Sequence, residues 1–260
     1  MILIKPSIDP VILSIGYVDI RWYSLAYIIG FVVGASLIKY LNKYYLNHIS
    51  NKQIDSFFVW SIFGVILGGR IGYVIFYQTN YFLINPIYIF KIWLGGMSFH
   101  GGLIGIIIAI FLFSRKNKID FFYLSDLVCI VAPIGLFFGR IANFINGELY
   151  GRITNFPIAM IYPEIDQEPR HPSQLYEAFF EGLLIFIILI FYFKKNNKNL
   201  KIGKISAIFL ILYSVFRFII EFLREPDIQI GLIFNYFSMG QILSLPLLAL
   251  GIIIFSKKWN

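Results

Sequence analysis

Runs of mostly apolar residues, each about as long as a lipid bilayer is thick, are the feature that most limits what this chain can fold into. A helix needs about 20 such residues to cross roughly 30 Å of hydrocarbon. Hydrophobic residues make up 58% of the 260 residues and charged residues only 14%, whereas an average soluble domain carries about 25% charged residues. We therefore exclude a soluble domain and predict an all-α integral membrane protein.

Seven stretches are apolar and long enough to be transmembrane helices. They lie at about residues 23–41, 57–77, 92–113, 121–139, 175–193, 205–223 and 236–255. Lysines and arginines gather after the first, third and fifth stretches and in the C-terminal tail. Because loops rich in basic residues stay in the cytoplasm, the N-terminus is predicted outside and the C-terminus inside.

Composition also limits the partners and cofactors that we expect. The net charge of +8 lies in short loops without the aromatic and arginine-rich motifs of nucleic-acid-binding proteins, so no nucleic-acid partner is predicted. Cys129, the single cysteine, excludes an intramolecular disulfide and is expected to be a packing residue. Three scattered histidines and this cysteine have no ligand spacing, so we predict no metal and no cofactor. No obligatory protein subunit is inferred.

The chain is predicted to form a single membrane-embedded domain of residues 1–260. Its first 20 residues form an N-terminal arm that lacks the basic start, continuous apolar core and cleavage site of a signal peptide, so no cleavage is expected. The longest loop, about residues 145–172, contains Pro157, Pro163, Pro169 and Pro172. Proline-rich loops are irregular, and the topology places this one outside, where we predict a small extracytoplasmic cap.

Polar and charged residues inside the apolar stretches are the first indication of a site. A charged residue near the bilayer centre costs about 2.5 to 3.5 kcal/mol on insertion scales, so such residues face a cavity or a partner. In the predicted topology, the residues toward the outer ends of their stretches are Tyr23, Arg70, Arg140, Glu177, Glu181, Arg217 and Glu221. His100, about nine residues into the third stretch, is expected near mid-membrane. We therefore predict about seven transmembrane helices around one polar cavity that opens toward the outer leaflet.

The charges at this depth leave two interpretations open. Arg217 and Glu221 are four residues apart and share a helix face, so they can form a purely structural ion pair. Arg70 and Arg140 have no such partner in the sequence and are expected to leave positive charge for an anion. In a membrane the obvious anion is a lipid phosphate.

Two segments are unusually rich in residues capable of chemistry. His100 precedes Gly101 and Gly102, which let a backbone or a ligand approach closely, although a lone membrane histidine is often only hydrogen-bonded. Residues 139–152 contain two arginines, two asparagines and a glutamate directly after an apolar stretch. A soluble surface does not explain so many polar groups beside the membrane, so both segments are candidates for a site.

Residues 139–151 read G-R-x-x-N-F-x-N-x-E-x-x-G, and this pattern resembles the signature of the prolipoprotein diacylglyceryl transferases. Residues 21–23, 68–73, 100–102, 171–177 and 217–227 resemble further segments of that family, in the same order. The resemblance covers nearly the whole chain. The loop between Gly151 and His171 is short compared with that of longer members, so the cap is expected to be reduced.

The resemblance implies an enzyme of the bacterial inner membrane. It implies transfer of the diacylglyceryl group of phosphatidylglycerol to the lipobox cysteine thiol of prolipoproteins, which forms a thioether, releases glycerol phosphate and begins lipoprotein maturation. The family's important positions fall on Tyr23, His100, Arg140, Asn143, Glu148, Gly151, Tyr213, Arg217 and Glu221. The candidates for contact with phosphatidylglycerol are Arg70, Arg140, Gly151, Tyr213 and Arg217.

Physical roles follow for these residues as hypotheses. Arg140 and Arg217 bind the lipid phosphate and stabilise the charge that develops on it, and His100 is the candidate base for the thiol. A thiol with a pKa of about 8.5 needs only modest help, so the field of the arginines is a second source of activation. The residues expected to orient substrates by hydrogen bonding are Tyr23, Asn143 and Glu148. Gly151 is expected at a backbone turn with no room for a larger residue.

Other classes of membrane protein remain open on composition alone. A transporter of an anionic lipid or small molecule would also use a positive cavity within the membrane; inverted repeats would favour it, and the sequence has none. An intramembrane protease is less well supported, because the chain has no HExxH, no GxSxG and no paired membrane aspartates. A purely structural membrane protein does not require so many buried charges.

Overall fold

The computed structural model describes residues 3–16, 18–43, 49–92, 95–196, 200–226, 231–233 and 236–257. Residues 1, 2 and 17 of the predicted N-terminal arm and residue 227 of the last family-like segment lie outside the described residues. The chain forms two compact units: unit 1 is Met1–Leu37 with Asp126–Asn260, and unit 2 is Ile38–Ser125. The single domain expected from the sequence stays a prediction.

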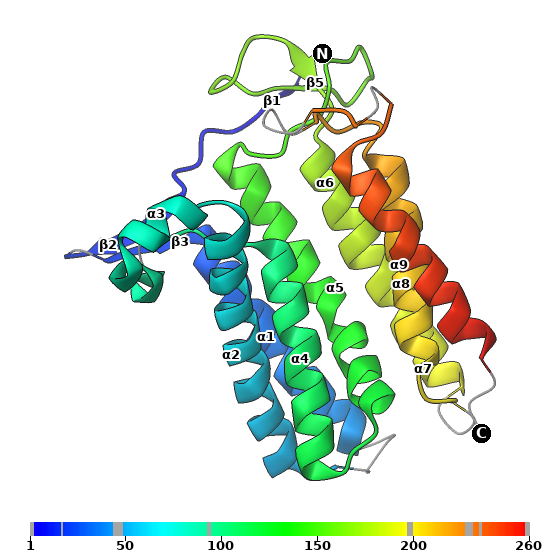
Figure 1. The fold of residues 1–260 in the computed structure, drawn as a ribbon. Coiled ribbons are helices and arrows are strands. Elements are labelled where there is room, and N and C mark those ends of the chain that lie inside the picture. The colour runs from blue at the N-terminus through cyan, green and yellow to red at the C-terminus, as the bar shows by residue number, and fades with distance from the viewer. Residues whose placement is uncertain are drawn as a thin grey trace. The chain divides into compact units, whose positions relative to one another are not determined.

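Unit 1 is built mainly from helices. They are α1 (Trp22–Leu41), α5 (Phe121–Asn146), α6 (Ser173–Glu177), the π-helix η4 (Ala178–Leu184), α7 (Ile185–Asn196), α8 (Lys204–Ile220) and α9 (Met239–Ser256). The end of α1 and the start of α5 belong to unit 2. α6, η4 and α7 follow one another without a break, so residues 173–196 form one continuous helix. α8 and α9 lie side by side (Figure 1), where a Cβ on Gly251 would lie only 2.9 Å from Cγ1 of Ile211.

Five short strands accompany the helices of unit 1. They are β1 (Leu3–Ile4), β2 (Val11–Ile15), β3 (Val18–Arg21), β4 (Met160–Ile161) and β5 (Pro169–Arg170). β1 pairs in parallel with β4, and β4 pairs antiparallel with β5. β2 and β3 form a separate antiparallel hairpin. The cap of residues 145–172 is therefore partly ordered by strands, and the N-terminal β1 completes its sheet, with Lys5 and Glu164 ion-paired at 2.5 Å.

Unit 2 contains two long helices that lie against each other (Figure 1). Its elements are α2 (Asn51–Phe76), α3 (Thr79–Ile84), the 3-10 helix η2 (Pro86–Phe90) and α4 (Phe99–Asn117). Glycines face each other where α2 meets α4. A Cβ at Gly105 would lie 1.9 Å from the carbonyl oxygen of Gly64, and one at Gly101 would lie 2.2 Å from that of Gly68. Only glycine permits so close an approach, and small residues are the usual contact between membrane helices.

Six helical segments are long and apolar enough to cross a membrane, by length and composition. They are α1, α2, α4, α5, the continuous helix of residues 173–196, and α9. The structure therefore confirms an all-α, multi-pass integral membrane protein. Of the seven predicted helices it supports six within the described residues, because α8 has only 17 residues. At 1.5 Å per residue α8 is about 26 Å long, which is close to the roughly 30 Å of hydrocarbon.

The third predicted stretch begins later than expected. α4 starts at Phe99 rather than at residue 92. Gly95 and Gly96 have φ angles of +83° and +81°, a left-handed backbone that does not continue into a helix. The Ser98 side chain then caps α4 by accepting a hydrogen bond from the Gly101 N–H at 3.2 Å. His100 consequently lies in the first turn of α4 rather than about nine residues into a helix, and its depth in the membrane stays a prediction.

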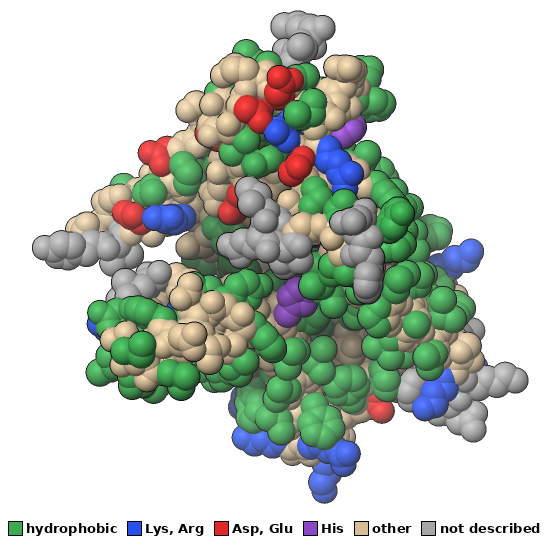
Figure 2. Space-filling model, turned by 45° about the horizontal axis from the view of Figure 1, so that its top comes forward, with side chains coloured by type: hydrophobic (Ala, Val, Ile, Leu, Met, Phe, Trp, Pro, Cys, Tyr) green, Lys and Arg blue, Asp and Glu red, His purple; other side chains and the backbone are tan. Residues whose placement is uncertain are grey.

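The surfaces of the helices suit a lipid environment. In Figure 2, apolar side chains cover much of the visible surface, and charged side chains lie in small separate groups. Phe63 and Phe76 of α2 and Ile253 of α9 are each at least 59% exposed. In a bilayer such side chains contact lipid, and the backbone polar groups of the helices stay satisfied internally.

Candidate active site

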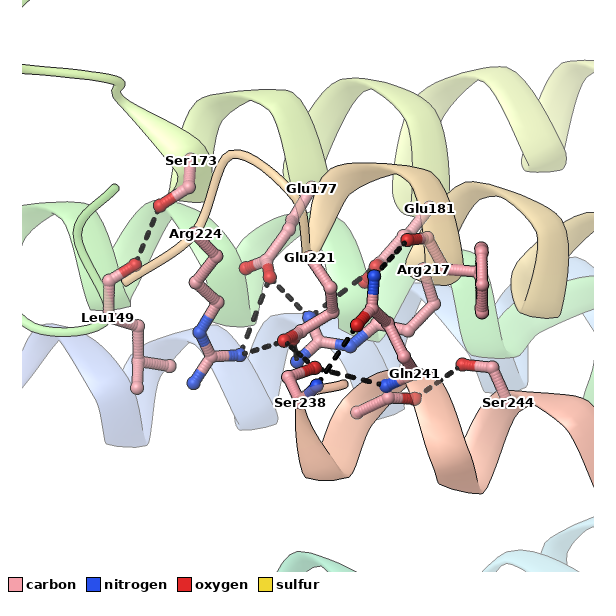
Figure 3. A network of polar contacts seen from close by, with 12 residues as sticks. Leu149, Ser173, Glu177, Glu181, Arg217, Glu221, Arg224, Ser238, Gln241 and Ser244 are labelled. Atoms are coloured by element: carbon pink, nitrogen blue, oxygen red, sulfur yellow. Dashed lines mark hydrogen bonds and ion pairs between the residues drawn. The ribbon is translucent and has the colours of Figure 1, made fainter. Parts of the chain in front are cut away.

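Six charged side chains of opposite sign meet inside unit 1. They are Arg140 near the end of α5, Glu177 at the end of α6, Glu181 in η4, Arg217 near the end of α8, and Glu221 and Arg224 directly after α8. Their side chains are at most 14% exposed. Figure 3 shows five of them with the contacts that join them. We call these six residues the ion cluster.

Glu177 is the most highly coordinated carboxylate of the ion cluster. Its Oε2 lies 3.2 Å from Nη1 of Arg140. Its Oε1 pairs with Nη1 of Arg217 and lies 3.5 Å from Nη1 of Arg224. A fully buried carboxylate is unfavourable unless nearby charges compensate it. Three guanidinium groups, from α5, α8 and the segment after α8, compensate Glu177.

Glu181, one turn further along the same continuous helix, is held less closely. Its Oε2 lies 3.4 Å from Nη2 of Arg140, and its Oε1 lies 3.6 Å from Nη1 of Arg217. The side chain is fully buried, and Oε1 makes no hydrogen bond within the described part of the chain. Glu181 belongs to the π-helix η4, and π segments within α-helices are often found at functional sites.

Glu221 joins the ion cluster to α9. Its Oε1 pairs with Nη2 of Arg217, as the spacing predicts, and lies 3.5 Å from Nη1 of Arg224. Ser238, the N-cap of α9, donates its hydroxyl to Oε2 of Glu221 at 2.6 Å (Figure 3). A Cβ at Gly240 would lie 2.6 Å from the carboxyl carbon of Glu221, so α9 packs directly on this side chain. The predicted pair of Arg217 and Glu221 is confirmed as part of a larger network.

The expectation that Arg140 is unpaired is wrong. Arg140 pairs with Glu177 and Glu181, because the continuous helix of residues 173–196 brings both carboxylates to its guanidinium. The three guanidinium groups and three carboxylates cancel, so the cluster has no net charge when all six are ionised. Positive charge for an anion is therefore available only where a carboxylate is protonated or displaced.

The motif residues at the end of α5 form a hydrogen-bonded turn. Asn143 Nδ2 donates to Oε1 of Glu148 at 2.8 Å, and the Glu148 N–H donates to the Asn143 carbonyl oxygen at 3.1 Å. Gln174 of α6 donates to the Glu148 carbonyl oxygen at 2.7 Å, and Ser173 donates to that of Leu149 at 2.8 Å. The start of α6, which leads into Glu177, is thereby fixed to the motif.

Gly151 lies where three segments converge. Its N–H donates to the His171 carbonyl oxygen at 2.9 Å, and the Arg152 N–H donates to that of Leu223 at 2.9 Å. A Cβ at position 151 would lie 2.4 Å from the His171 oxygen and 2.7 Å from the Leu223 oxygen. The predicted lack of room for a larger residue is confirmed, and its cause is the close approach of two backbones.

Charged residues tie the cap to the segment after α8. Arg170 Nη2 pairs with Oδ2 of Asp166 at 2.6 Å, and its Nη1 donates to the Gly151 carbonyl oxygen at 3.2 Å and to Oε2 of Glu225 at 3.3 Å. The hydrogen bonds from Arg170 hold the pKa of Asp166 below its usual range. Burial lowers the pKa of the His171 imidazole, which favours its neutral form.

The two tyrosines expected at the site lie in aromatic pairs of unit 1. Tyr23, in the first turn of α1, packs edge-on against Tyr27 with ring centroids 5.3 Å apart. Tyr213 stacks on Phe209 at 5.8 Å and precedes Arg217 by four residues. Tyr213 and Arg217 therefore share a face of α8.

Arg70 and His100 lie in unit 2. The carbonyl oxygens that accept hydrogen bonds from the Arg70 guanidinium, at 2.5 to 3.3 Å, are those of Tyr88, Ile89, Lys91, Gly95 and Gly96. These bonds use the donors of Arg70 to fix the loop before α4, so the expectation that Arg70 is free for an anion is wrong. His100 is exposed at the start of α4, and its role as a base stays a prediction.

A family model described as prolipoprotein diacylglyceryl transferase matches residues 10–257 of the chain. The chain belongs to this family. The resemblance drawn from residues 139–151 and from the other segments is thereby confirmed, and it extends over α1 to α9 rather than over the motif alone.

Proteins of three Rickettsia species are similar to the chain over almost its full length. Each is named phosphatidylglycerol–prolipoprotein diacylglyceryl transferase. The protein of Rickettsia bellii (strain OSU 85-389) is 51% identical over 252 residues, which cover 97% of this chain and 96% of the relative. The protein of Rickettsia typhi is 53% identical over 249 residues, 96% of each chain. The protein of Rickettsia felis is 52% identical over 246 residues, 95% of each chain.

Three members of the ion cluster receive no role from the sequence: Glu177, Glu181 and Arg224. The sequence does indicate that Glu177 and Glu181 are paired, because two carboxylates four residues apart inside an apolar stretch require partners. Their partners, however, come from α5, from α8 and from the segment that follows it. Sequence spacing reveals ion pairs within one helix, and only the fold brings these separate helices together.

Proposed function

We propose that this family member transfers the diacylglyceryl group of phosphatidylglycerol to the lipobox cysteine of prolipoproteins, the first step of lipoprotein maturation. One observation carries the proposal: relatives named for this reaction are at least 51% identical over at least 95% of the chain. We place the enzyme in the bacterial inner membrane, with the N-terminus outside and the C-terminus in the cytoplasm, because its basic loops alternate.

Arg140 and Arg217 are the proposed ligands of the lipid phosphate. A planar guanidinium can hold two phosphate oxygens at once, and such bonds are strong in a buried site. Both arginines face the carboxylates of Glu177 and Glu181, so a phosphate oxygen would take a position like that of a carboxylate oxygen. Arg70 is not part of the proposed site, because backbone carbonyl oxygens occupy its donors.

The thiol is proposed to attack the glyceryl carbon of the lipid rather than its phosphorus. A sulfur–carbon bond forms, the carbon–oxygen bond to the phosphate breaks, and glycerol phosphate leaves. Negative charge then develops on the departing oxygen, where Arg140 and Arg217 stabilise it. Attack on phosphorus would instead transfer a phosphatidyl group and release free glycerol.

The other candidate residues have supporting roles in this proposal. His100 accepts the proton of the thiol. Asn143 and Glu148, which are hydrogen-bonded to each other, orient the substrates together with Tyr23. Gly151 keeps the end of the motif close to His171 and Leu223.

The function is tested with purified protein, phosphatidylglycerol and a lipobox peptide, followed by mass spectrometry. The peptide should gain a diacylglyceryl group, with one glycerol phosphate released for each modified peptide. Its new linkage should survive the mild alkali that removes the acyl chains, and a peptide with serine in place of cysteine is the control. An unmodified peptide would overturn the function, whereas free glycerol with phosphorus retained on the peptide would overturn the bond assignment.

The orientation is tested separately with an impermeant thiol reagent on intact cells. In a Cys129→Ala background, Asn155→Cys in the cap should react and Lys194→Cys near the end of α7 should not. Both positions are exposed, so accessibility of the side chain does not decide the result. Labelling of position 194 from outside would overturn the orientation.

A further inference from the structure

Glu181 differs from the other carboxylates of the ion cluster. Its nearest guanidinium nitrogens lie 3.4 and 3.6 Å away. Glu177 approaches three guanidinium groups, and Glu221 accepts a hydrogen bond from Ser238 in addition to its two arginines. The Glu181 side chain is fully buried, and its Oε1, like Oε2 of Glu177, has no hydrogen-bond donor among the described residues. Glu181 is therefore the least compensated carboxylate of the cluster.

Charge balance limits what happens when a phosphate enters the ion cluster. The cluster is neutral when all six groups are ionised, and a phosphodiester adds one negative charge. An uncompensated charge in a buried site is unfavourable, and the arginines, already protonated, cannot take up another proton. A proton on one carboxylate restores neutrality.

Few groups other than Glu181 could carry this proton, as the side chains that face Glu181 show. They are Arg140 from α5, Glu177 from α6, and Tyr213 and Arg217 from α8. The arginines already carry their charge, and a tyrosine is neutral with its proton on. Glu177 is compensated by three guanidinium groups, which favours its ionised form.

We propose that Glu181 carries a proton whenever Arg140 and Arg217 hold the phosphate of phosphatidylglycerol; this inference rests on the function proposed above. The proton comes from water, so the complex of the cluster with the lipid phosphate has no net charge. A protonated Glu181 no longer competes for Nη2 of Arg140 and Nη1 of Arg217, and these donors turn to the phosphate. Glu181 is thus a charge-compensating residue that sets how the lipid binds.

Infrared spectroscopy of the lipid complex tests the proposal directly. The lipid is a dialkyl phosphatidylglycerol, whose ether-linked chains have no ester carbonyl to mask the stretch of a protonated carboxylic acid. Bound wild type should show this stretch, shifted in heavy water, and Glu181→Gln should lose it. Glu168→Gln, at an exposed position of the cap, should keep it, and Glu181→Asp should keep it at a different frequency, because the proton then lies on an aspartic acid.

The affinity for the same lipid gives a second measurement. Where the lipid-free carboxyl is ionised, binding takes up one proton, so the wild-type Kd should rise about tenfold per pH unit. The glutamine side chain in Glu181→Gln is neutral at every pH, so the Kd of this variant should not rise tenfold per pH unit. A Glu181→Gln variant with the wild-type slope would overturn the proposal.

The spectra also distinguish a failure of the inference about Glu181 from a failure of the proposed transferase function. Bound wild type without the acid stretch overturns the inference, whether or not any variant folds. A stretch that survives in Glu181→Gln, or that keeps its wild-type frequency in Glu181→Asp, places the proton on another group and overturns it as well. Wild type that binds the lipid with the stretch, yet never modifies the peptide, rejects the proposed transferase function and leaves the protonation of Glu181 standing.

Discussion

Arg70 of unit 2 and the arginines of the ion cluster look alike in the sequence but have different partners. Each lies near the end of an apolar helix. Arg70 donates to five backbone carbonyl oxygens, whereas Arg140 and Arg217 face the carboxylates of Glu177 and Glu181. A carbonyl oxygen cannot be protonated at physiological pH or leave its place in the chain, but a carboxylate can be protonated or displaced. A buried arginine is available to an anion only where its partners can release it.

This difference assigns different consequences to the loss of each arginine. Removing a donor from Arg70 leaves carbonyl oxygens of the loop before α4 without a partner, which affects the folded state. Removing a donor from Arg140 or Arg217 takes a proposed contact from the phosphate, which affects the reaction.

The largest effect is expected for Arg140→Lys. Lysine keeps the charge but presents a single ammonium where the guanidinium holds two phosphate oxygens. If one charge-assisted hydrogen bond worth about 1.5 to 3 kcal/mol is lost, kcat/KM falls about ten- to a hundredfold. The measurement is the rate of peptide modification at matched protein concentration. Wild-type kcat/KM in this variant would remove Arg140 from the phosphate site.

Arg70→Lys should affect stability and leave the chemistry nearly intact. An ammonium has only three donors for five carbonyl oxygens, so at least two lose their bond to residue 70, and each buried oxygen left unsatisfied costs about 1 to 3 kcal/mol. The Tm in detergent should fall, while kcat per folded molecule stays within about threefold of wild type, a barrier change below about 1 kcal/mol. An unchanged Tm with a lost activity would instead place Arg70 at the substrate. Arg70 would then not differ from the arginines of the ion cluster in the way described above.

Arg217 and Glu221 should be energetically coupled. Arg217→Ala and Glu221→Ala should each reduce activity and Tm, and the double variant should be less impaired than independent effects predict. For side chains in contact, coupling of at least about 0.5 kcal/mol is expected. A double-mutant cycle on the free energy of unfolding measures it. Additive losses would show that the pair contributes nothing beyond its separate members.

Asp166 should give the smallest effect, because its ion pair with Arg170 lies in the partly exposed cap. Its folded-state pKa is lowered, so the pair stabilises the protein above the unfolded pKa of about 4 and this contribution disappears as the pH falls through the folded value. Asp166→Asn should lower the Tm slightly at neutral pH and converge with wild type in acid. Glu168→Gln, at an exposed position of the same loop, is the control. A Tm difference that is constant with pH would show that the ionised Asp166 carboxylate is not the source of the stabilisation.

The sequence predicts the parts of the fold that depend on neighbours along the chain. Apolar stretches of membrane length locate six helices, and the spacing of Arg217 and Glu221 predicts their pairing. The lack of space at Gly151 also agrees with its expected role. Each of these features follows from local composition or from the period of a single helix.

The start of α4 shows where such local reasoning fails. Residues 92–98 are apolar enough to extend the third stretch, but hydropathy does not report backbone conformation. Gly95 and Gly96 adopt positive φ, and the loop that contains them is bound to Arg70 of α2. The same limit applies to the ion cluster, whose partners for Arg140 are supplied by another helix. A sequence pattern within one helix does not contain this information.

Solid-state nuclear magnetic resonance tests most directly whether the cluster arginines, and not Arg70, hold the lipid phosphate. Protein with ¹⁵N-labelled arginine is bound to phosphatidylglycerol in frozen micelles of a phosphorus-free detergent, and ³¹P dephasing of the guanidinium ¹⁵N signals reports direct contact. We predict dephasing in wild type that decreases in Arg140→Lys and in Arg217→Lys and is unchanged in Arg70→Lys. Dephasing that persists in both cluster variants and disappears in Arg70→Lys would contradict the account.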